Sequence, residues 1–263
     1  MWIDIHVHET EPIELLLQSM EKNGIDRAFV CSSAVARGEQ VHSLQDAKRI
    51  LGHVAKAQNH GGSALTVEEV NRALAKKLAP YGDRLLGFGK VDLYEQDMAK
   101  QLTSIVECGL HGIGEIIGIH EHVDLLRPVL AFSETRGNFP VFIHCDFPVE
   151  RQDIQHLFDL IEEYPLSRVI VGHLGGNHWM DVLQRAEGLS QCLIDISEVV
   201  NYIPLYVAIA EYPDKVAFGS DFPWDLQEVN LTRIREMDLS EKRMSMLMGK
   251  NVERFLGWHD EEN

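Results

Sequence analysis

The chain begins with MWIDIHVHE (residues 1–9), and this stretch decides the fold class. Its short apolar run, interrupted by histidines, predicts a β-strand that already carries candidate metal ligands. An open, doubly wound α/β sheet usually follows its first strand with a glycine-rich phosphate-binding turn. Here the strand runs into His-Val-His-Glu instead, and this ending favours a closed barrel.

Eight apolar runs alternate with longer amphipathic segments from one end of the chain to the other. Strands that alternate with helices need crossover connections, and these produce a parallel sheet. Eight strand–helix units close into a barrel of about 250 residues. We therefore predict an α/β fold, a single (β/α)8 TIM barrel that spans residues 1–263. The predicted strands are Trp2–His6, Arg27–Cys31, Leu85–Val91, Gly112–Ile116, Val141–His144, Val169–Gly172, Cys192–Ile196 and Lys215–Gly219, and the clearest helices are Ile13–Lys22, Val67–Leu78, Asp97–Cys108, Asp153–Tyr164 and Trp179–Ala186.

Two segments do not follow this repeat. Residues 32–62 separate the second strand from its helix, where about two to six residues are usual. We expect an insertion here, with a helix at about 42–58. Because it leaves the carboxyl end of a strand, we expect it to form a lid or a substrate wall. The tail, Leu239–Leu256, predicts an extra C-terminal helix that closes the barrel base or covers its last helix.

The balance of charges indicates which partners the protein avoids. The chain has 41 acidic and 24 basic residues, a formal net charge of −17. Such a surface repels polyanions at long range, so we expect neither nucleic acid nor a membrane as a partner. No run of about 18 apolar residues is present, and we expect no membrane span. A locally cationic metal site could still bind an anionic small molecule.

The cysteines and the N-terminal strand indicate where the protein works. The four cysteines lack the paired spacing of zinc sites or disulfide frameworks. The first strand starts at Trp2, which leaves no room for a signal or transit peptide. We expect a cytoplasmic protein with reduced cysteines.

Five of the eight predicted strands end in a side chain of a metal-ligand type. The strands of a barrel all end at one rim, so these side chains are expected to converge near the barrel axis. Capping or solvent exposure could explain any one of them, but their coincidence at one rim predicts a metal site. They are His6 and His8 on the first strand, Glu115 on the fourth, His144 on the fifth, His173 on the sixth and Asp221 on the eighth.

The histidine pair on the first strand points to one face. His6 and His8 are two residues apart, which matches the period of a strand. Buried imidazoles need partners for their ring nitrogens, and a divalent ion satisfies one nitrogen of each ring. The other nitrogen needs an acceptor, for which Asp4 or backbone carbonyls are candidates. A similar pair, His120 and His122, falls in a predicted loop, where solvated histidines are the simpler interpretation.

The order of these motifs resembles that of the amidohydrolase superfamily. The similarity runs from residue 1 to about residue 255 and is closest to the amidohydrolase-related (amidohydrolase 2) branch of metal-dependent hydrolases. This branch contains small barrel hydrolases and non-oxidative decarboxylases. The motifs are Asp4-Ile5-His6-Val7-His8, Ile143-His144-Cys145, Gly172-His173-Leu174-Gly175-Gly176 and Gly219-Ser220-Asp221-Phe222-Pro223-Trp224.

The resemblance implies a role for each rim residue. His173 would be a ligand of a second metal or a catalytic base and electrophile. Glu115 resembles the strand-4 glutamate with which some members of the superfamily bridge two metals. The decarboxylases of this branch typically use one metal and lack a bridging acid, so one or two ions remain open. Histidine and carboxylate donors suit zinc first, then manganese, iron or cobalt. Four residues would bind the principal metal, namely His6, His8, His144 and Asp221.

The resemblance therefore implies a metal-dependent hydrolase of a small-molecule amide, ester or lactone. A divalent ion lowers the pKa of water toward about 7, and Asp221 would act as the general base. The alternative is a metal-dependent, non-oxidative decarboxylase of an unsaturated or aromatic carboxylic acid. A TatD-type nuclease is disfavoured by the net charge and by the residues that follow Glu115. The intact ligand set disfavours a non-enzymatic scaffold protein.

Three residues in the rim loops are predicted to contact the substrate. Asn177 and Trp179 follow the sixth strand, and Trp224 follows the eighth. An aromatic wall around a small planar or carboxylated molecule is one interpretation, and ordinary loop packing is the other. The sequences of these loops do not reveal which substrate the protein binds. The resemblance further implies a homodimer.

Overall fold

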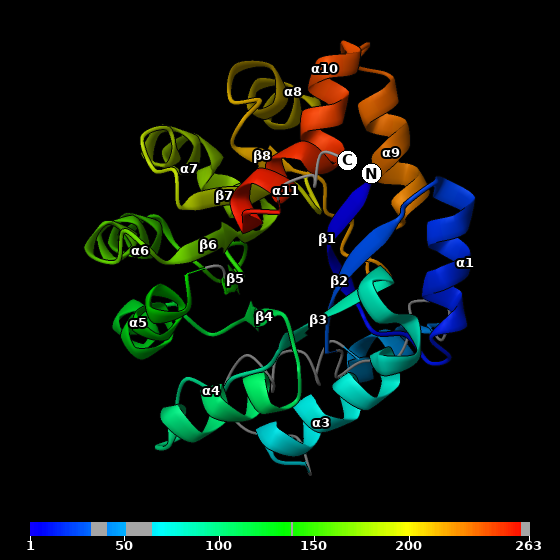
Figure 1. Cartoon of the computed structure of the whole chain (residues 1–263). Helices are drawn as coiled ribbons and strands as arrows, with labels where there is room; N and C mark the ends of the chain where they lie inside the picture. The colour runs from blue at the N-terminus through cyan, green and yellow to red at the C-terminus, as the bar shows by residue number, and fades with distance from the viewer. Residues whose placement is uncertain (33–40, 51–64, 138, 259–263) are drawn as a thin grey trace, which may run out of the picture.

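Eight parallel strands form one sheet in which each strand pairs with the next along the chain (Figure 1). The structure is a computed structural model and describes residues 1–32, 41–50, 65–137 and 139–258. The strand order confirms the predicted TIM barrel. The strands are β1 (Ile3–His8), β2 (Arg27–Cys31), β3 (Leu85–Gly89), β4 (Gly112–Ile116), β5 (Pro140–Ile143), β6 (Arg168–Val171), β7 (Cys192–Asp195) and β8 (Val216–Ala217).

Hydrogen bonds between β1 and the segment after β8 close the barrel. Val7 forms a parallel bridge with Phe222. The amide of Asp221 donates to the carbonyl of His6 at 2.8 Å. The eighth strand is shorter than predicted. Beyond Ala217 the chain runs beside β1 and is joined to it by isolated backbone hydrogen bonds, which do not form a regular ladder. This closure places Asp221 beside the histidines of β1.

Helices lie on the outside of the barrel, as the amphipathic segments predict (Figure 1). A capping box begins α3, in which Thr66 accepts from the amide of Glu69 and the Glu69 side chain accepts from the amide of Thr66. The α-helices are α1 (Glu14–Asn23), α3 (Val67–Leu78), α4 (Met98–Glu107), α5 (Arg127–Arg136), α6 (Arg151–Glu163), α7 (Trp179–Ala186), α8 (Tyr202–Glu211), α9 (Gln227–Arg235), α10 (Glu241–Ser245) and α11 (Asn251–Leu256). Short helical segments are η2 (Ala79–Arg84), η3 (Val123–Leu126), η4 (Gly172–His178) and η5 (Met246–Lys250).

The base of the barrel is filled by large apolar side chains. Phe29, Phe88 and Phe142 point inward from three strands and form one buried cluster with Phe255 of α11. The ring centroids of Phe29 and Phe88 lie 4.9 Å apart. Helix α11 therefore closes the base, one of the two roles predicted for the C-terminal tail. A larger apolar cluster joins the outer faces of the strands to the helices.

The C-terminal tail is helical but broken. The predicted helical region over Leu239–Leu256 is confirmed, and it consists of α10, the π-helical segment η5 and α11. Gly249 in η5 lies against the start of the chain, where a Cβ would be 2.2 Å from the carbonyl oxygen of Met1. The close approach of the N-terminal strand explains the break.

The predicted insertion after β2 lies largely outside the described residues, because 33–40 and 51–64 are not described. Residues 44–50 are helical, within the range expected for the helix of the insertion. The lid role stays a prediction.

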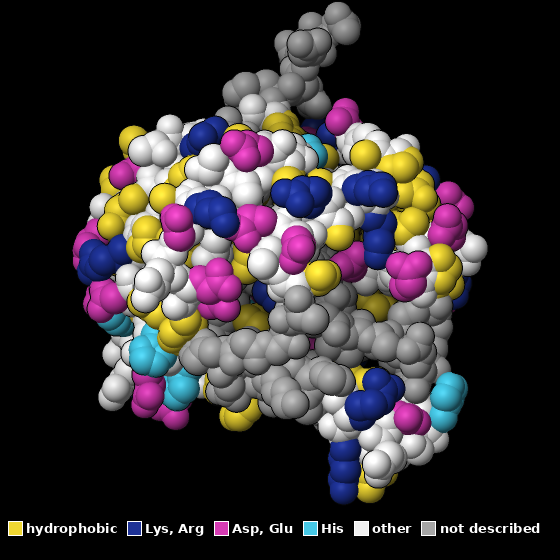
Figure 2. All heavy atoms as spheres, turned by 90° about the horizontal axis from the view of Figure 1, so that it is seen from below, with side chains coloured by type: hydrophobic (Ala, Val, Ile, Leu, Met, Phe, Trp, Pro, Cys, Tyr) yellow, Lys and Arg dark blue, Asp and Glu magenta, His cyan; other side chains and the backbone are white. Residues whose placement is uncertain are grey.

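The surface mixes charges of both signs. Figure 2 shows acidic and basic side chains interspersed over one face of the molecule. Among the helices of the described residues, none is long and apolar enough to cross a membrane.

Candidate metal centre

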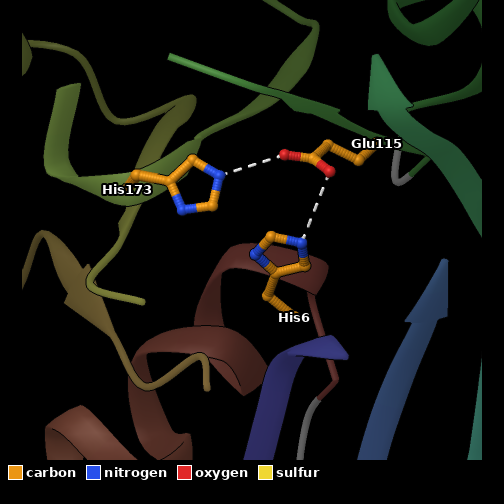
Figure 3. Close-up of side chains that lie close together, drawn as sticks. All are labelled: His6, Glu115 and His173. Atoms are coloured by element: carbon orange, nitrogen blue, oxygen red, sulfur yellow. Dashed lines mark hydrogen bonds and ion pairs between the residues drawn. The ribbon is translucent and has the colours of Figure 1, made fainter. Parts of the chain in front are cut away.

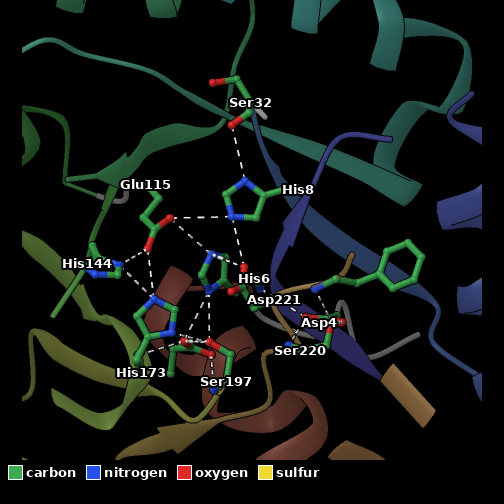
Figure 4. Close-up of polar contacts among 12 residues, drawn as sticks. Asp4, His6, His8, Ser32, Glu115, His144, His173, Ser197, Ser220 and Asp221 are labelled. Atoms are coloured by element: carbon green, nitrogen blue, oxygen red, sulfur yellow. Dashed lines mark hydrogen bonds and ion pairs between the residues drawn. The ribbon is translucent and has the colours of Figure 1, made fainter. Parts of the chain in front are cut away.

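All six predicted ligand side chains meet at the carboxyl ends of the strands (Figure 4). The backbones of His173 and Asp221 are left-handed, with φ of 54° and 58°. This conformation is unfavourable for residues other than glycine and clusters at functional sites. The six side chains come from β1 (His6 and His8), from β4 (Glu115) and from the residues just after β5 (His144), β6 (His173) and β8 (Asp221).

His6, His8 and Asp221 form a compact set of donors. The Nε2 atoms of His8 and His6 lie 3.1 Å and 3.4 Å from Asp221 Oδ1. Donor atoms bonded at about 2.0–2.1 Å to a tetrahedral zinc ion lie about 3.3 Å from one another. The spacing of the three side chains therefore fits a single divalent ion.

Two atoms of this set lack a hydrogen-bond partner. His6 Nε2 and Asp221 Oδ1 are both buried, and neither has a partner in the described part of the chain. An unsatisfied buried polar atom costs about 1–3 kcal/mol and is rare in folded proteins. The two atoms face each other, and a cation between them would satisfy both. This observation supports a divalent metal at the site.

Glu115 lies between two groups of histidines, as Figure 3 shows for His6 and His173. Its Oε2 is 3.7 Å from His6 Nε2 and 3.6 Å from His8 Nε2. Its Oε1 is 2.8 Å from His144 Nδ1 and 3.1 Å from His173 Nε2. The last two nitrogens are 3.0 Å apart. Each carboxylate oxygen thus belongs to a different set of donors, as in a bridging ligand.

The cluster favours the charged form of its groups. Burial raises the pKa of Glu115, but His6 and His144 outweigh this effect and hold that pKa well below its ordinary value. Burial lowers the pKa of His6, but Asp221 and Glu115 raise it well above the ordinary value. The pKa of His173 rises to about 9 despite burial, because Glu115 accepts its hydrogen bond. Positive charge is therefore required here, and a metal ion could supply it in place of protons.

The end of β7 contributes two residues that sequence reasoning missed. Ser197 Oγ lies 3.1 Å from His6 Nδ1 and 3.0 Å from His173 Nδ1, and the hydroxyl donates to Asp195. Both rings can donate Nδ1–H to this oxygen, which leaves their Nε2 atoms free of protons for a metal. The sequence signal that could have revealed them is Asp195-Ile196-Ser197. It places two polar residues two positions apart, on one face of the chain where β7 ends.

Gly219 permits β8 to approach this network. A Cβ at this position would lie 1.9 Å from Asp195 Oδ1 and 3.0 Å from His6 Cβ. Position 219 of the Gly219-Ser220-Asp221 motif therefore requires glycine, because a side chain there would collide with Asp195 and His6.

Glu198 is a further carboxylate at the rim that sequence reasoning missed. Its carboxylate oxygen and donor atoms of His173 and Asp221 all lie within 4.8 Å of one another. Its backbone is left-handed, with φ of 56°. Loss of solvent around the carboxyl group raises its pKa, and the charge of Asp221 adds to this effect. The polar end of β7 was again the signal.

Backbone carbonyls, and not Asp4, hold the other nitrogens of two further histidines. His8 Nδ1 lies 3.3 Å from the carbonyl oxygen of Ser32, and His144 Nε2 lies 3.1 Å from that of Phe147. The prediction that backbone carbonyls could serve is confirmed for these rings. The alternative role of Asp4 is wrong.

Asp4 instead joins β1 to the end of the barrel. Its carboxylate accepts from the hydroxyl of Ser220 at 2.6 Å and from Gln227 Nε2 at 2.9 Å. Burial raises the pKa of Asp4 to about 7 against these hydrogen bonds. This contact explains why an aspartate precedes the histidine pair: it fixes β1 against the segment that carries Asp221.

The predicted substrate residues follow β6 and β8, the strands that lead to His173 and Asp221. Trp179 is half-buried and packs against the apolar core at the start of α7. Asn177 is exposed, and Trp224 is 37% exposed. In the described residues, their side chains make no hydrogen bond or ring contact with the six ligands. Their role in binding substrate stays a prediction.

His120 is not a freely solvated loop histidine. Its Nδ1 lies 2.8 Å from Asp153 Oδ2 on α6, and the pair fixes the loop after β4 to that helix. His122 is exposed and makes an edge contact with the ring of Tyr94. The expectation of solvated histidines thus fails for His120, because α6 supplies a carboxylate that the loop sequence does not reveal.

The fold and the donor cluster together define a metal-dependent barrel enzyme. The family model described as amidohydrolase (Amidohydro_2) matches residues 3–258. The chain therefore belongs to the amidohydrolase family, as the motifs indicate. No curated protein matches the chain in sequence.

Solved structures share this fold at low sequence identity. The 5-carboxyvanillate decarboxylase of Sphingomonas paucimobilis is 15% identical, covers 97% of this chain and 98% of its own, and has a TM-score of 0.67. An amidohydrolase from Burkholderia multivorans with bound zinc is 13% identical over 98% of this chain and 99% of its own, with a TM-score of 0.67. A dihydroxybenzoic acid decarboxylase from Polaromonas with bound manganese is 13% identical over 97% and 96%, with a TM-score of 0.66.

Proposed function

We propose that the protein is a metal-dependent hydrolase of a small-molecule amide, ester or lactone. The observation that carries this proposal is the position of Glu115 between two donor sets. One set is His6, His8 and Asp221, and the other is His144 and His173. A bridging carboxylate is suited to two ions about 3.5–4 Å apart, the arrangement of many hydrolytic centres.

This arrangement assigns His144 differently from the motif resemblance. The resemblance groups His144 with His6, His8 and Asp221 around one principal ion. In the structure His144 Nδ1 instead adjoins His173 Nε2 and Glu115 Oε1. We place it with His173 on the second ion.

Asp221 performs the proton transfers of the hydrolysis. When bound, the metal supplies Lewis acidity toward water and the substrate carbonyl. Asp221 accepts the proton of the attacking water and passes it to the leaving group, a task for a carboxylate within hydrogen-bond reach. Ser197 keeps His6 and His173 in the tautomer that presents Nε2. The buried apolar cluster that contains Phe142 fills the barrel below the site, so water and substrate reach the site from the rim.

The metal is most suitably zinc, with manganese next. Four imidazoles and two carboxylates form a donor set that zinc, manganese, iron and cobalt all accept. Similar barrels hold zinc in one case and manganese in another. The donor spacing of 3.1–3.4 Å within the set of His6, His8 and Asp221 is compatible with zinc bond lengths.

A decarboxylase of an aromatic or unsaturated acid is the second candidate. Several of the similar structures are decarboxylases of aromatic acids. In this candidate the β1 histidines and Asp221 would hold one ion. His173, whose pKa is raised by its hydrogen bond to Glu115, would deliver a proton to the ring carbon from which carbon dioxide leaves. The presence of Glu115 between the histidines favours hydrolysis over this alternative.

Elemental analysis and an activity panel test the proposal. The purified protein is expected to hold two ions per chain, and Glu115→Ala is expected to retain one or none. Glu187→Ala, at an exposed glutamate far from the rim, is the matched control. Turnover of a lactone, ester or amide supports hydrolysis. One ion in both proteins, together with release of carbon dioxide from an aromatic acid, would establish the decarboxylase instead.

A further inference from the structure

A second polar site lies at the end of the barrel opposite the metal centre. Three cationic side chains line a pocket of about 210 Å³ at the amino ends of the strands. Arg168 begins β6, Lys215 immediately precedes β8, and Arg254 lies on α11. The metal ligands follow the carboxyl ends of the same strands, so this base pocket (Arg168, Lys215, Arg254) is a separate place in the molecule.

Lys215 is the buried member of the base pocket. The residue is only 9% exposed, and its Nζ donates to the carbonyl oxygen of Leu189 at 2.8 Å. An ammonium group has three protons to donate, and a buried charge without a counter-charge is costly. Among the described residues, no carboxylate forms an ion pair with this group.

Neutral acceptors hold the two arginines in place. The guanidinium of Arg168 lies 5.7 Å from the ring centroid of Phe255. Arg254 Nη2 donates to the carbonyl oxygen of Asp214 at 2.6 Å. In the part of the chain that the structure describes, neither arginine pairs with a carboxylate, and each keeps N–H groups free of these contacts.

In the described residues, the three cations of the base pocket lie together without a carboxylate partner, although the chain is rich in carboxylates. Acidic residues outnumber basic ones by 41 to 24, and several other arginines of the described residues pair with carboxylates. Arg127 bonds to Glu163, and Arg151 bonds to Asp181. One carboxylate, that of Asp214, also lines the base pocket, but it is exposed and not paired with the three cations. Three positive charges are thus kept together where an acidic chain could easily have neutralised them.

We propose that the base pocket binds a phosphate-type oxyanion, either free phosphate or the phosphoryl group of a metabolite. Arginine and lysine are the side chains that recognise phosphate, and charge-assisted bonds to it are the strong ones. Ser190 also lines the pocket, and a serine hydroxyl is a further possible donor to an oxyanion. The pocket is small, which suits a compact anion. The bound anion would join β6, β8 and α11 and stabilise the barrel base without taking part in the chemistry at the mouth.

Calorimetric titration of the metal-loaded protein with inorganic phosphate, at constant ionic strength in chloride, tests this proposal. Lys215→Met keeps the length of the side chain and removes the charge, and we expect it to weaken phosphate binding at least about tenfold. Lys242→Met, at an exposed lysine of α10, is the control and is expected to bind as the wild type does. Arg168→Gln is the second variant, with the same expected loss, in case Lys215→Met does not fold.

A parallel titration with glycerol phosphate distinguishes the two sources of the anion. Tighter binding than that of inorganic phosphate indicates the phosphoryl group of a metabolite, and weaker or equal binding indicates free phosphate. Absence of phosphate binding to the wild type would overturn the proposal. Unchanged affinity in a folded Lys215→Met or Arg168→Gln would also overturn it, because the anion would then bind elsewhere, for example at the metal centre.

Discussion

His6, His144 and Asp221 are each expected to be indispensable for turnover. Each alanine variant removes a donor atom from the cluster and leaves the barrel core intact, so we expect a loss of at least about 100-fold in kcat with a modest change in stability. Steady-state rates on a verified substrate and the circular dichroism melting temperature measure both effects. His156→Ala, on the exposed face of α6, is the control. Wild-type rates in all three variants would show that the site is wrongly assigned.

Ser197 is expected to act as a positioning residue through the two histidines that it contacts. Ser197→Ala removes the shared acceptor of His6 and His173, so we expect metal affinity to fall by about 10–100-fold. Competition with a chelator of known affinity measures this loss, and Ser245→Ala at an exposed position is the control. Excess zinc should restore much of the turnover of Ser197→Ala. Unchanged metal affinity would contradict this role.

Among the elements, the loop after β4 is expected to be held to α6 by a pH-dependent contact. The hydrogen bond to Asp153 raises the pKa of His120. Burial raises the pKa of Asp153, but His120 and the amides of Glu150 and Glu121 together hold that pKa below its ordinary value. The contact therefore stabilises the fold fully below the ordinary histidine pKa of about 6.5, and its contribution is lost as the pH rises through the raised pKa. At the acidic end it is lost as Asp153 becomes protonated, below its ordinary pKa of about 3.8.

His120→Gln tests this contact. We expect the variant to melt below the wild type at pH 6, by up to about 4 °C, and to differ much less at pH 9. Thermal melting at both pH values measures the difference. His122→Gln, two residues away and exposed, should melt like the wild type at each pH. A deficit of His120→Gln that is equal at both pH values would show that the contact does not depend on protonation.

At the scale of the whole molecule, the metal is expected to stabilise the barrel. The cluster draws ligands from five strands, so an ion that binds only the folded state connects distant parts of the chain. A ligand at about 100 times its Kd contributes about 2.7 kcal/mol, which for a chain of this size corresponds to about 5–10 °C in Tm. Scanning calorimetry before and after chelation measures the shift, and zinc or manganese should restore both Tm and activity. Full activity after prolonged dialysis against a strong chelator would contradict metal dependence.

The family resemblance also predicts a homodimer. Light scattering coupled to size-exclusion chromatography should give about twice the chain mass of 29.8 kDa. The net charge of −17 opposes self-association at low ionic strength, so the measurement belongs at physiological salt, where the screening length is about 8 Å. A mass of one chain at all protein concentrations would show that the protein is a monomer.

The sequence by itself determined the barrel and which side chains meet at its rim. Hydrophobic runs that alternate with amphipathic segments are a local signal, and the strand ends of such a repeat must share one rim. His6, His8, Glu115, His144 and the other two rim residues could therefore be named from the ends of the predicted strands. The π-helical segment within the C-terminal helical region could not be named in this way, because the conformation at Gly249 depends on contact with Met1.

Only the tertiary structure decided which atoms face one another. The roles of Ser197 and Asp195 depend on β7 lying between the strands that lead to His173 and to Asp221, and Asp4 contacts a helix more than 200 residues away. The same holds for Glu115, whose two oxygens face different histidines. Side-chain direction and the distance between strands follow from barrel closure and packing, and these are long-range properties that no local pattern in the chain records.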